Sequence, residues 1–198
     1  MSKLKELTWE NHKRAERSNF MRRMLKREMT SYEYYVYLTN QLMCYYVLET
    51  YADQLGLLKD IEHLKRSSKI SKDISEFERL EGFEQPPPLQ STQKYMKYLE
   101  SISRHPEKLM AHIYVRHMGD LSGGQIIKKL VPGSGLYYEF EGNIDELKAK
   151  IRSKLNDNMA EEANICFNMV YAMLEELENS FDGMETTYQT IRTDRTDI

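Results

Sequence analysis

The chain has 198 residues, of which 40% are hydrophobic and 30% charged, and its formal net charge is −3. This length and balance predict one folded domain with its own core, and they exclude a disordered chain and a general attraction to nucleic acid. Only 9 glycines and 5 prolines occur, which argues against a turn-rich all-β fold. No run of 18 apolar residues is present, so no membrane-spanning helix is expected.

The compartment is indicated by the N-terminal segment and the cysteines. The first sixteen residues alternate charged with apolar side chains and lack the apolar centre of a signal peptide. Cys44 and Cys166 each lie among apolar neighbours, which indicates buried, reduced thiols. We therefore expect a monomeric cytoplasmic protein, or one in an equivalent plastid stroma, with no membrane contact.

Helical patterns dominate the first half of the chain. A first helix is predicted over residues 3–17. Thr30 and Glu33 have the spacing of a capping box and predict the start of a long helix that ends near Gly56. A more polar helix follows, over residues 58–80.

Proline and serine mark the boundaries of the next elements. Pro86 to Pro88 cannot continue a helix and predict an extended connector. Ser91 is a candidate N-cap for a helix over residues 92–103. Pro106 opens another helix, which reaches Leu130. The loop over residues 132–142 is the one stretch where a short hairpin is conceivable.

The last third of the chain predicts one more long amphipathic region. Asn143 and Glu146 again have capping-box spacing, and an apolar stripe runs on to Leu177. Residues 181–198 are polar and aperiodic, which predicts a flexible tail. The fold class is therefore all-α, a single-domain multi-helix bundle over residues 1–180.

Glycines interrupt the helix predicted over residues 106–130. Gly119, Gly123 and Gly124 each cost about 1 kcal/mol relative to alanine in a helix interior. They bare the backbone on one side, permit a kink, and let a flat rigid ligand lie close. A close helix crossing, or a helix that ends and restarts, explains the glycines as well. Asp120 favours a site, because a carboxylate there needs a polar, hydrogen-bonded environment.

The segment around Asp120 matches a known sequence signature. Residues 114–125 read Tyr-x-Arg-x-x-Gly-Asp-Leu-Ser-Gly-Gly-Gln, which resembles the distal-helix signature of the heme oxygenases. Agreement extends to Lys5, His12 and Glu16, to the tyrosine-rich second helix and to the basic stretch 148–156, and so covers about residues 3–178. The family's fold is an all-α bundle that holds heme between an N-terminal proximal helix and a glycine-kinked distal helix.

The resemblance implies a heme-binding set. His12 falls where the family has the axial ligand of the heme iron, a role that suits neutral imidazole. Glu16, four residues on, is placed to orient that ring. Lys148 and Arg152 share a helix face, as two carboxylates would require. The residues placed to bind the heme propionates are Lys5, Tyr114, Lys148 and Arg152.

The resemblance also implies a distal, catalytic set. Gly119, Gly123 and Gly124 would bring helix backbone down onto the heme plane. Asp120 would hold ordered waters that deliver protons without direct contact with the bound oxygen. The remaining members of this polar network would be Tyr45, Arg116 and Asn168.

The activity implied is the conversion of heme, with dioxygen and electrons, into biliverdin, carbon monoxide and ferrous iron. Heme is both substrate and cofactor, and no other metal is expected. A ferredoxin or a flavin reductase would supply electrons by docking on a basic segment, residues 13–27. An ordinary solvated face is the alternative for this segment. Its seven basic residues are Lys13, Arg14, Arg17, Arg22, Arg23, Lys26 and Arg27.

Three other functions are weighed against this one. A heme carrier or sensor would not need Asp120. A thiamin-degrading enzyme of a related bundle would need an activated nucleophilic cysteine, and neither Cys44 nor Cys166 has a basic neighbour in the sequence. A nucleic-acid-binding module is disfavoured by the negative net charge.

Overall fold

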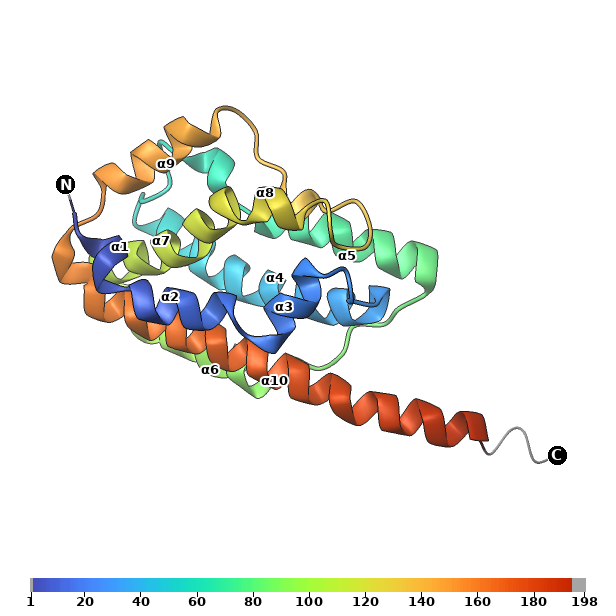
Figure 1. Cartoon of the computed structure of the whole chain (residues 1–198). Helices are drawn as coiled ribbons and strands as arrows, with labels where there is room; N and C mark the ends of the chain where they lie inside the picture. The colour runs from blue at the N-terminus through green and yellow to red at the C-terminus, as the bar shows by residue number, and fades with distance from the viewer. Residues whose placement is uncertain (1, 194–198) are drawn as a thin grey trace.

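The structure is a computed structural model that describes residues 2–193, with side chains up to Phe181. Within that range the chain forms helices and connecting loops without a strand (Figure 1), which confirms the all-α prediction. The α-helices are α1 (Leu4–Leu7), α2 (Trp9–Glu16), α3 (Asn19–Leu25), α4 (Ser31–Gln54), α5 (Ser67–Glu81), α6 (Gln90–Ser101), α7 (Pro106–Ser122), α8 (Gly124–Ile127), α9 (Ile144–Ser153) and α10 (Ala160–Thr193). Short 3-10 turns lie at η1 (Glu62–Leu64), η2 (Leu136–Tyr138) and η3 (Asp157–Met159).

Helix α4 forms the centre of the bundle. It is buried on nearly all sides and packs against α5, α6 and α7, as expected of a central helix. Its predicted capping box is confirmed: the Thr30 hydroxyl accepts a hydrogen bond from the Glu33 amide at 3.2 Å, and the Glu33 carboxylate accepts one from the Thr30 amide at 2.8 Å.

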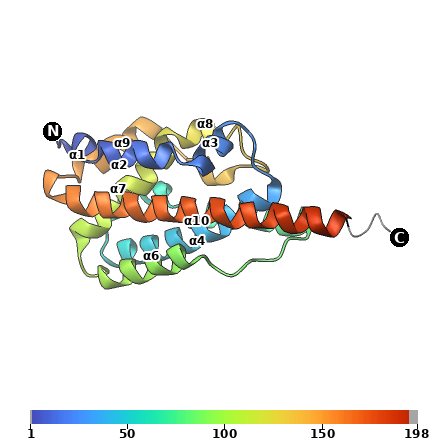
Figure 2. The same cartoon turned by 60° about the horizontal axis from the view of Figure 1, so that its bottom comes forward.

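Helix α10 runs along α2, α3, α6 and α7 and continues beyond the rest of the bundle (Figures 1 and 2). It stays helical to Thr193, past the position 181 at which a tail was predicted. Residues 194–198 lie outside the described residues, so the division into a domain over residues 1–180 and a flexible tail remains a prediction. None of the described helices is apolar over a length that would cross a lipid bilayer.

The N-terminal segment differs from the single predicted helix. It breaks at Thr8, whose hydroxyl donates to the Leu4 carbonyl oxygen at 2.8 Å, and continues as α2. A further helix, α3, follows at once because the Ser18 hydroxyl accepts from the Met21 amide at 3.3 Å and caps it. The prediction of one helix over residues 3–17 missed both the break at Thr8 and the helix α3.

The start of α6 corrects the assignment of Ser91 as N-cap. The helix begins at Gln90, one residue before Ser91. The amide groups of Gln90 and Ser91 donate to the Glu176 carboxylate of α10, at 3.0 and 2.7 Å. A side chain from a helix 85 residues away therefore satisfies amides at the start of α6.

The second half of the chain also has more breaks than predicted. Helix α7 ends at Ser122, and α8 restarts at Gly124. The loop after α8 contains the turn η2 and no hairpin. Residues 154–159 separate α9 from α10, and the Asn143 side chain caps α9 by accepting from the Asp145 and Glu146 amides.

Candidate functional site

Asp120 lies buried on α7 and is directly bonded to two tyrosines. The Tyr45 hydroxyl, from α4, donates to Asp120 Oδ2 at 2.5 Å, and the Tyr137 hydroxyl, from η2, donates to Oδ1 at 3.1 Å. Burial raises the pKa of Asp120, while the Tyr45 hydrogen bond lowers it. The structure thus brings Tyr45 and Asp120 together, and it adds Tyr137, for which the loop sequence carried no signal.

Arg116 lies one turn before Asp120 and belongs to the same buried cluster. Its guanidinium donates to the Gln41 side chain and stands over the rings of Tyr45 and Tyr95, at 4.6 and 5.0 Å from their centroids. Its Nε and Nη1 atoms are buried without a protein partner. Buried N–H groups of this kind are usually satisfied by ordered water, so the surroundings of Asp120 suit a hydrated polar network.

Asn168 does not join this cluster. Its side chain is exposed on α10, whereas the two residues before it, Cys166 and Phe167, point into the core. Successive residues of a helix differ in direction by about 100°, so the residue after Phe167 turns away from the bundle. The geometry gives no support to a role for Asn168 beside Asp120.

The three glycines of the motif have two different environments. Gly119 is exposed, and a Cβ placed on it would meet no atom within 4 Å. Gly123 is exposed as well, with only the Gly119 carbonyl oxygen near, at 3.5 Å. Gly124 is buried against Tyr138. Gly119 and Gly123 therefore present bare backbone to open space, as a flat ligand requires, whereas Gly124 is a packing residue.

His12 is held in a defined orientation on α2. Its ring stacks on Trp9 at 5.4 Å and 14° and meets the ring of Phe167 edge-on at 5.6 Å. Nδ1 is buried and lies 3.6 Å from a carboxylate oxygen of Glu16, while 35% of the side chain is exposed. Nε2, on the opposite side of the ring from Nδ1, is thus the nitrogen available to bind a metal, and Glu16 is placed to orient the ring.

The predicted propionate-binding residues come from three helices. Lys5 of α1 lies 5.8 Å from the centroid of the Trp9 ring. Tyr114 of α7 is half-buried, and burial raises the pKa of its hydroxyl, while Thr8 and Arg152 lower it. Arg152 and Lys148 lie on α9, which packs on α7. Arg152 and Tyr114 are therefore neighbours, and Lys148 lies one turn away from Arg152.

Cys166 has basic neighbours in space that it lacks in the sequence. Tyr95 lies 3.7 Å from its sulfur, and the Tyr95 hydroxyl is 2.9 Å from His112 Nδ1. Burial raises the pKa of the Cys166 thiol, but His112, Arg116 and Tyr95 together lower it below its ordinary value. The expectation that no base lies near Cys166 is wrong. The thiol is fully buried, however, so no substrate reaches it.

Comparison with known proteins decides the family. Residues 1–176 match the family whose description is "Heme oxygenase". The chain belongs to the heme oxygenase family. Heme oxygenase of Guillardia theta is 32% identical over 90% of this chain and 86% of its own length. Heme oxygenase 1 of Gallus gallus is also 32% identical over 77% of this chain, which spans only 58% of that relative's length.

Solved structures of heme oxygenases share the fold. Heme oxygenase-1 of the cyanobacterium Synechocystis, solved in complex with heme, superposes with a TM-score of 0.80 at 25% identity and covers 96% of both chains. Heme oxygenase of Leptospira interrogans has a TM-score of 0.77 at 30% identity, over 87% of this chain and 97% of its own.

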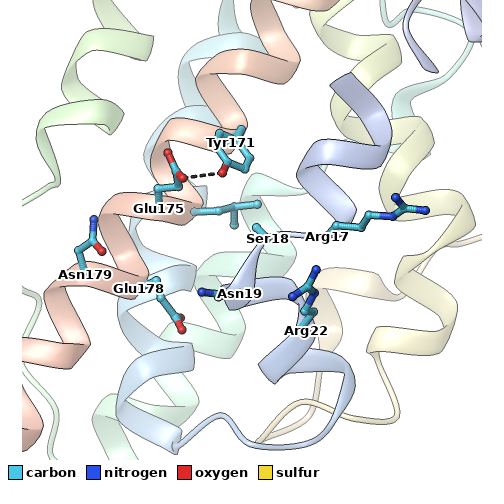
Figure 3. A pocket seen from close by; sticks show the side chains of 9 residues that line it. Arg17, Ser18, Asn19, Arg22, Tyr171, Glu175, Glu178 and Asn179 are labelled. Atoms are coloured by element: carbon cyan, nitrogen blue, oxygen red, sulfur yellow. Dashed lines mark hydrogen bonds between the residues drawn. The ribbon is translucent and has the colours of Figure 1, made fainter. Parts of the chain in front are cut away.

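A polar pocket elsewhere on this heme oxygenase is a separate feature. It lies between the α2–α3 joint and α10, with Arg17 and Arg22 on one wall and Glu175 and Glu178 on the other (Figure 3). Its volume is about 220 Å³, below the usual range of pockets that enclose an organic ligand. Neither His12 nor Asp120 lines it, so it is not the heme site.

Proposed function

We propose that this chain binds heme between α2 and α7–α8 and cleaves it oxidatively to biliverdin, carbon monoxide and ferrous iron. The observation that carries the proposal is the combination, on α7 and the break that follows it, of bare backbone at Gly119 and Gly123 with the buried carboxylate of Asp120. Heme supplies the redox-active iron and is itself the molecule that is cleaved. A bundle that only packed helices would not need an unoccupied glycine face next to a buried charge.

On the α2 side one nitrogen would bind the heme iron. His12 Nε2 would be that ligand, and Glu16 and Trp9 fix the plane of the ring. A ring held in this way loses little rotational freedom on binding, which favours ligation. No described cluster of three or more His, Cys, Asp and Glu side chains offers a second metal site.

The residues of α7 control how closely the porphyrin approaches the helix backbone and where protons are held. Without side chains, Gly119 and Gly123 let helix backbone cover one face of the porphyrin, which limits water and biases attack toward one edge. Asp120 holds a proton or releases it through water, because burial and the Tyr45 hydrogen bond act on its pKa in opposite directions. Arg116 supplies the unpartnered N–H groups that organise this water.

The heme carboxylates would be bound where α7 packs against α9. Lys148 and Arg152 are one turn apart, and the Tyr114 hydroxyl lies near Arg152. Lys5 extends the same cationic region from α1. Two carboxylates need such paired donors, since charge-assisted hydrogen bonds are about twice as strong as neutral ones.

Only part of the basic segment is free to attract an acidic electron donor. Arg23 is paired with Glu33 and Glu178, Arg14 stacks on the Tyr171 ring at 3.9 Å, and Lys13 is paired with Glu10. Arg17, Arg22 and Lys26 are exposed. These three are our proposed docking residues for a ferredoxin or flavin reductase. The two buried free cysteines support a reducing, cytoplasmic or stroma-like compartment, and we propose a monomer.

The test is an aerobic optical titration with hemin, followed by a reductase or ascorbate. We expect saturable binding at one heme per chain, and then loss of the heme band as biliverdin absorbance and carbon monoxide appear. Saturable binding with heme that stays intact under reductant and oxygen would make the protein a carrier or sensor. Absence of binding would show that the glycine face serves packing only.

A further inference from the structure

The Tyr137 hydroxyl lies beside both Asp120 and Tyr45, and it donates its single hydrogen to Asp120 Oδ1. This hydroxyl lies 3.1 Å from Asp120 Oδ1 and 3.2 Å from the Tyr45 hydroxyl, which in turn donates to Asp120 Oδ2 at 2.5 Å. Tyr137 is fully buried, with 1% of its surface exposed. Both carboxylate oxygens of Asp120 are therefore fixed by a phenol, one from α4 and one from the loop after α8.

Two buried charged side chains hold the turn that carries Tyr137. The Arg66 guanidinium donates to the carbonyl oxygens of Tyr137 and Glu139, at 3.0 and 2.6 Å. The Asp73 carboxylate accepts from the amides of Leu136 and Tyr137, at 2.9 and 2.8 Å. We call these two residues the Arg66–Asp73 clamp. Burying an arginine and an aspartate is costly unless they are hydrogen-bonded, and here both are used on one short turn.

We infer that Tyr137 is a positioning residue of the reaction, which holds the Asp120 carboxylate charged and in a fixed orientation, and that the Arg66–Asp73 clamp positions Tyr137. A phenol O–H that points at a carboxylate stabilises its charged form. With one donor on each oxygen, the carboxylate cannot rotate, and its remaining lone pairs keep a constant direction toward water. The link to catalysis rests on the proposed function, whereas the effect on Asp120 does not.

Other groups around Asp120 also shift its pKa, in addition to Tyr137. Burial disfavours the charged carboxylate, and Tyr45 together with nearby basic side chains favours it. The basic side chains are His117, Arg116 and Arg66, and further buried phenols in the neighbourhood of Asp120 are Tyr34, Tyr37 and Tyr138. Removing the Tyr137 hydroxyl leaves all of these in place and withdraws one donor, so the pKa of Asp120 rises.

The experiment is an infrared pH titration of the heme-free protein, in which the C=O stretch of protonated Asp120 is assigned by its loss in Asp120→Asn. Tyr137→Phe is expected to move the midpoint upward by about one pH unit, the size that one lost hydrogen bond to a charged group gives. Tyr138→Phe is the matched control. Its hydroxyl faces Tyr37 at 3.4 Å, and its removal is expected to leave the midpoint near the wild-type value.

Arg66→Lys provides a second variant that retains the Tyr137 hydroxyl and the positive charge but loses the guanidinium fork. It is expected to shift the midpoint in the same direction by loosening the clamp. An unchanged midpoint of the Asp120 titration in Tyr137→Phe overturns the inference. If Tyr137→Phe does not fold, an unchanged midpoint in Arg66→Lys overturns it instead. A shifted midpoint with a wild-type pH profile of hemin turnover overturns the role in the reaction. If wild type leaves hemin intact, the proposed function fails, and the titration still decides whether Tyr137 controls Asp120.

Discussion

The ring of Tyr138 fills the space that a side chain at position 124 would need: a Cβ on Gly124 would lie 2.6 Å from Tyr138 Cδ1. Gly119, five residues earlier, has nothing within 4 Å of the same position. Two glycines of one short motif therefore meet opposite requirements. One allows two parts of the protein to touch, and the other keeps a surface clear for a ligand.

This difference predicts opposite outcomes for two alanine substitutions. Gly124→Ala is expected to lower the free energy of unfolding by about 1–3 kcal/mol, because Tyr138 must move. Gly119→Ala is expected to leave it unchanged or raise it by up to about 1 kcal/mol, since alanine favours the helix, and yet to weaken hemin binding. Urea denaturation and hemin titration measure the two quantities. Hemin affinity equal to wild type in both Gly119→Ala and the larger Gly119→Leu would contradict the proposed distal face.

His12→Ala tests the proximal ligand. The variant is expected to lose the spectrum of a histidine-ligated heme and to retain under about 1% of turnover, since no other described residue replaces the nitrogen. Added imidazole is expected to restore the spectrum in part. His63→Ala, which removes an exposed histidine, serves as the control and is expected to behave as wild type. Full turnover in His12→Ala would remove the ligand assignment.

Asp120→Ala tests the proton network. Hemin binding is expected within about threefold of wild type, because Asp120 is not proposed to contact the porphyrin. The biliverdin yield is expected to fall by about 10²-fold or more, in line with the loss of a general acid–base group. Peroxide-driven oxidation of a small phenol is expected to increase. Product analysis of single turnovers measures all three, and a normal biliverdin yield would show that another group directs the protons.

A buried ion pair between α7 and α10 makes stability depend on pH. His112 Nε2 lies 3.0 Å from the Glu162 carboxylate. Burial raises the pKa of Glu162, but His112, Tyr98 and Lys108 lower it to about 2, from 4.5. Burial lowers the pKa of His112, but Cys166 and Glu162 raise it to about 9, from 6.5. The Glu162 contribution is present above pH 4.5 and is lost toward pH 2, and the His112 contribution is present below pH 6.5 and is lost through pH 9.

Glu162→Gln is therefore expected to lower Tm most between pH 4.5 and 6.5, with a smaller difference from wild type on either side. Circular-dichroism melting at a series of pH values measures this. The matched control is Glu161→Gln, at the exposed neighbouring position, for which we expect no such window. If the Tm difference between Glu162→Gln and wild type varies by no more than experimental error from about pH 3 to about pH 10, the His112–Glu162 pair is not the cause of the pH-dependent stability.

Reversing charge in the basic segment tests the electron-donor surface. Arg17→Glu with Arg22→Glu is expected to reduce reductase-dependent turnover by about tenfold at low salt and less at high salt, because steering is screened. Ascorbate-driven turnover is expected to remain at the wild-type level. Lys59→Glu with Lys72→Glu, outside this segment, is the control. Equal losses in the two double variants would assign the effect to net charge alone.

Local sequence signals predicted the elements that depend on neighbours in the chain. The capping box at Thr30 was predicted correctly because both partners lie within four residues. Ser91 failed as an N-cap because the helix begins one residue earlier, where the carboxylate of Glu176, from a distant helix, accepts from the Gln90 and Ser91 amides. The break at Thr8 was missed, because a hydroxyl that bonds back to the preceding turn has no distinct pattern in the sequence.

The residues of the candidate site likewise divide into those that depend on neighbours in the chain and those that depend on distant contacts. The motif of α7 predicted that Arg116 and Asp120 belong together, since their spacing places them one turn apart. Tyr137 could not be predicted, because its position depends on two clamp residues, Arg66 and Asp73, more than 60 residues earlier. Asn168 was assigned by its place in the sequence alone, and the direction of α10 turns it outward.

The bond between Glu176 and the start of α6 has a consequence for folding. Helix α6 has no side-chain cap of its own at its N-terminus, so docking of α10 stabilises its first turn. The two helices are then expected to form as one cooperative unit, protected together in amide exchange. A proteolytic cut within α10 is therefore expected to increase amide exchange first near residue 90, in a segment that is not itself cut.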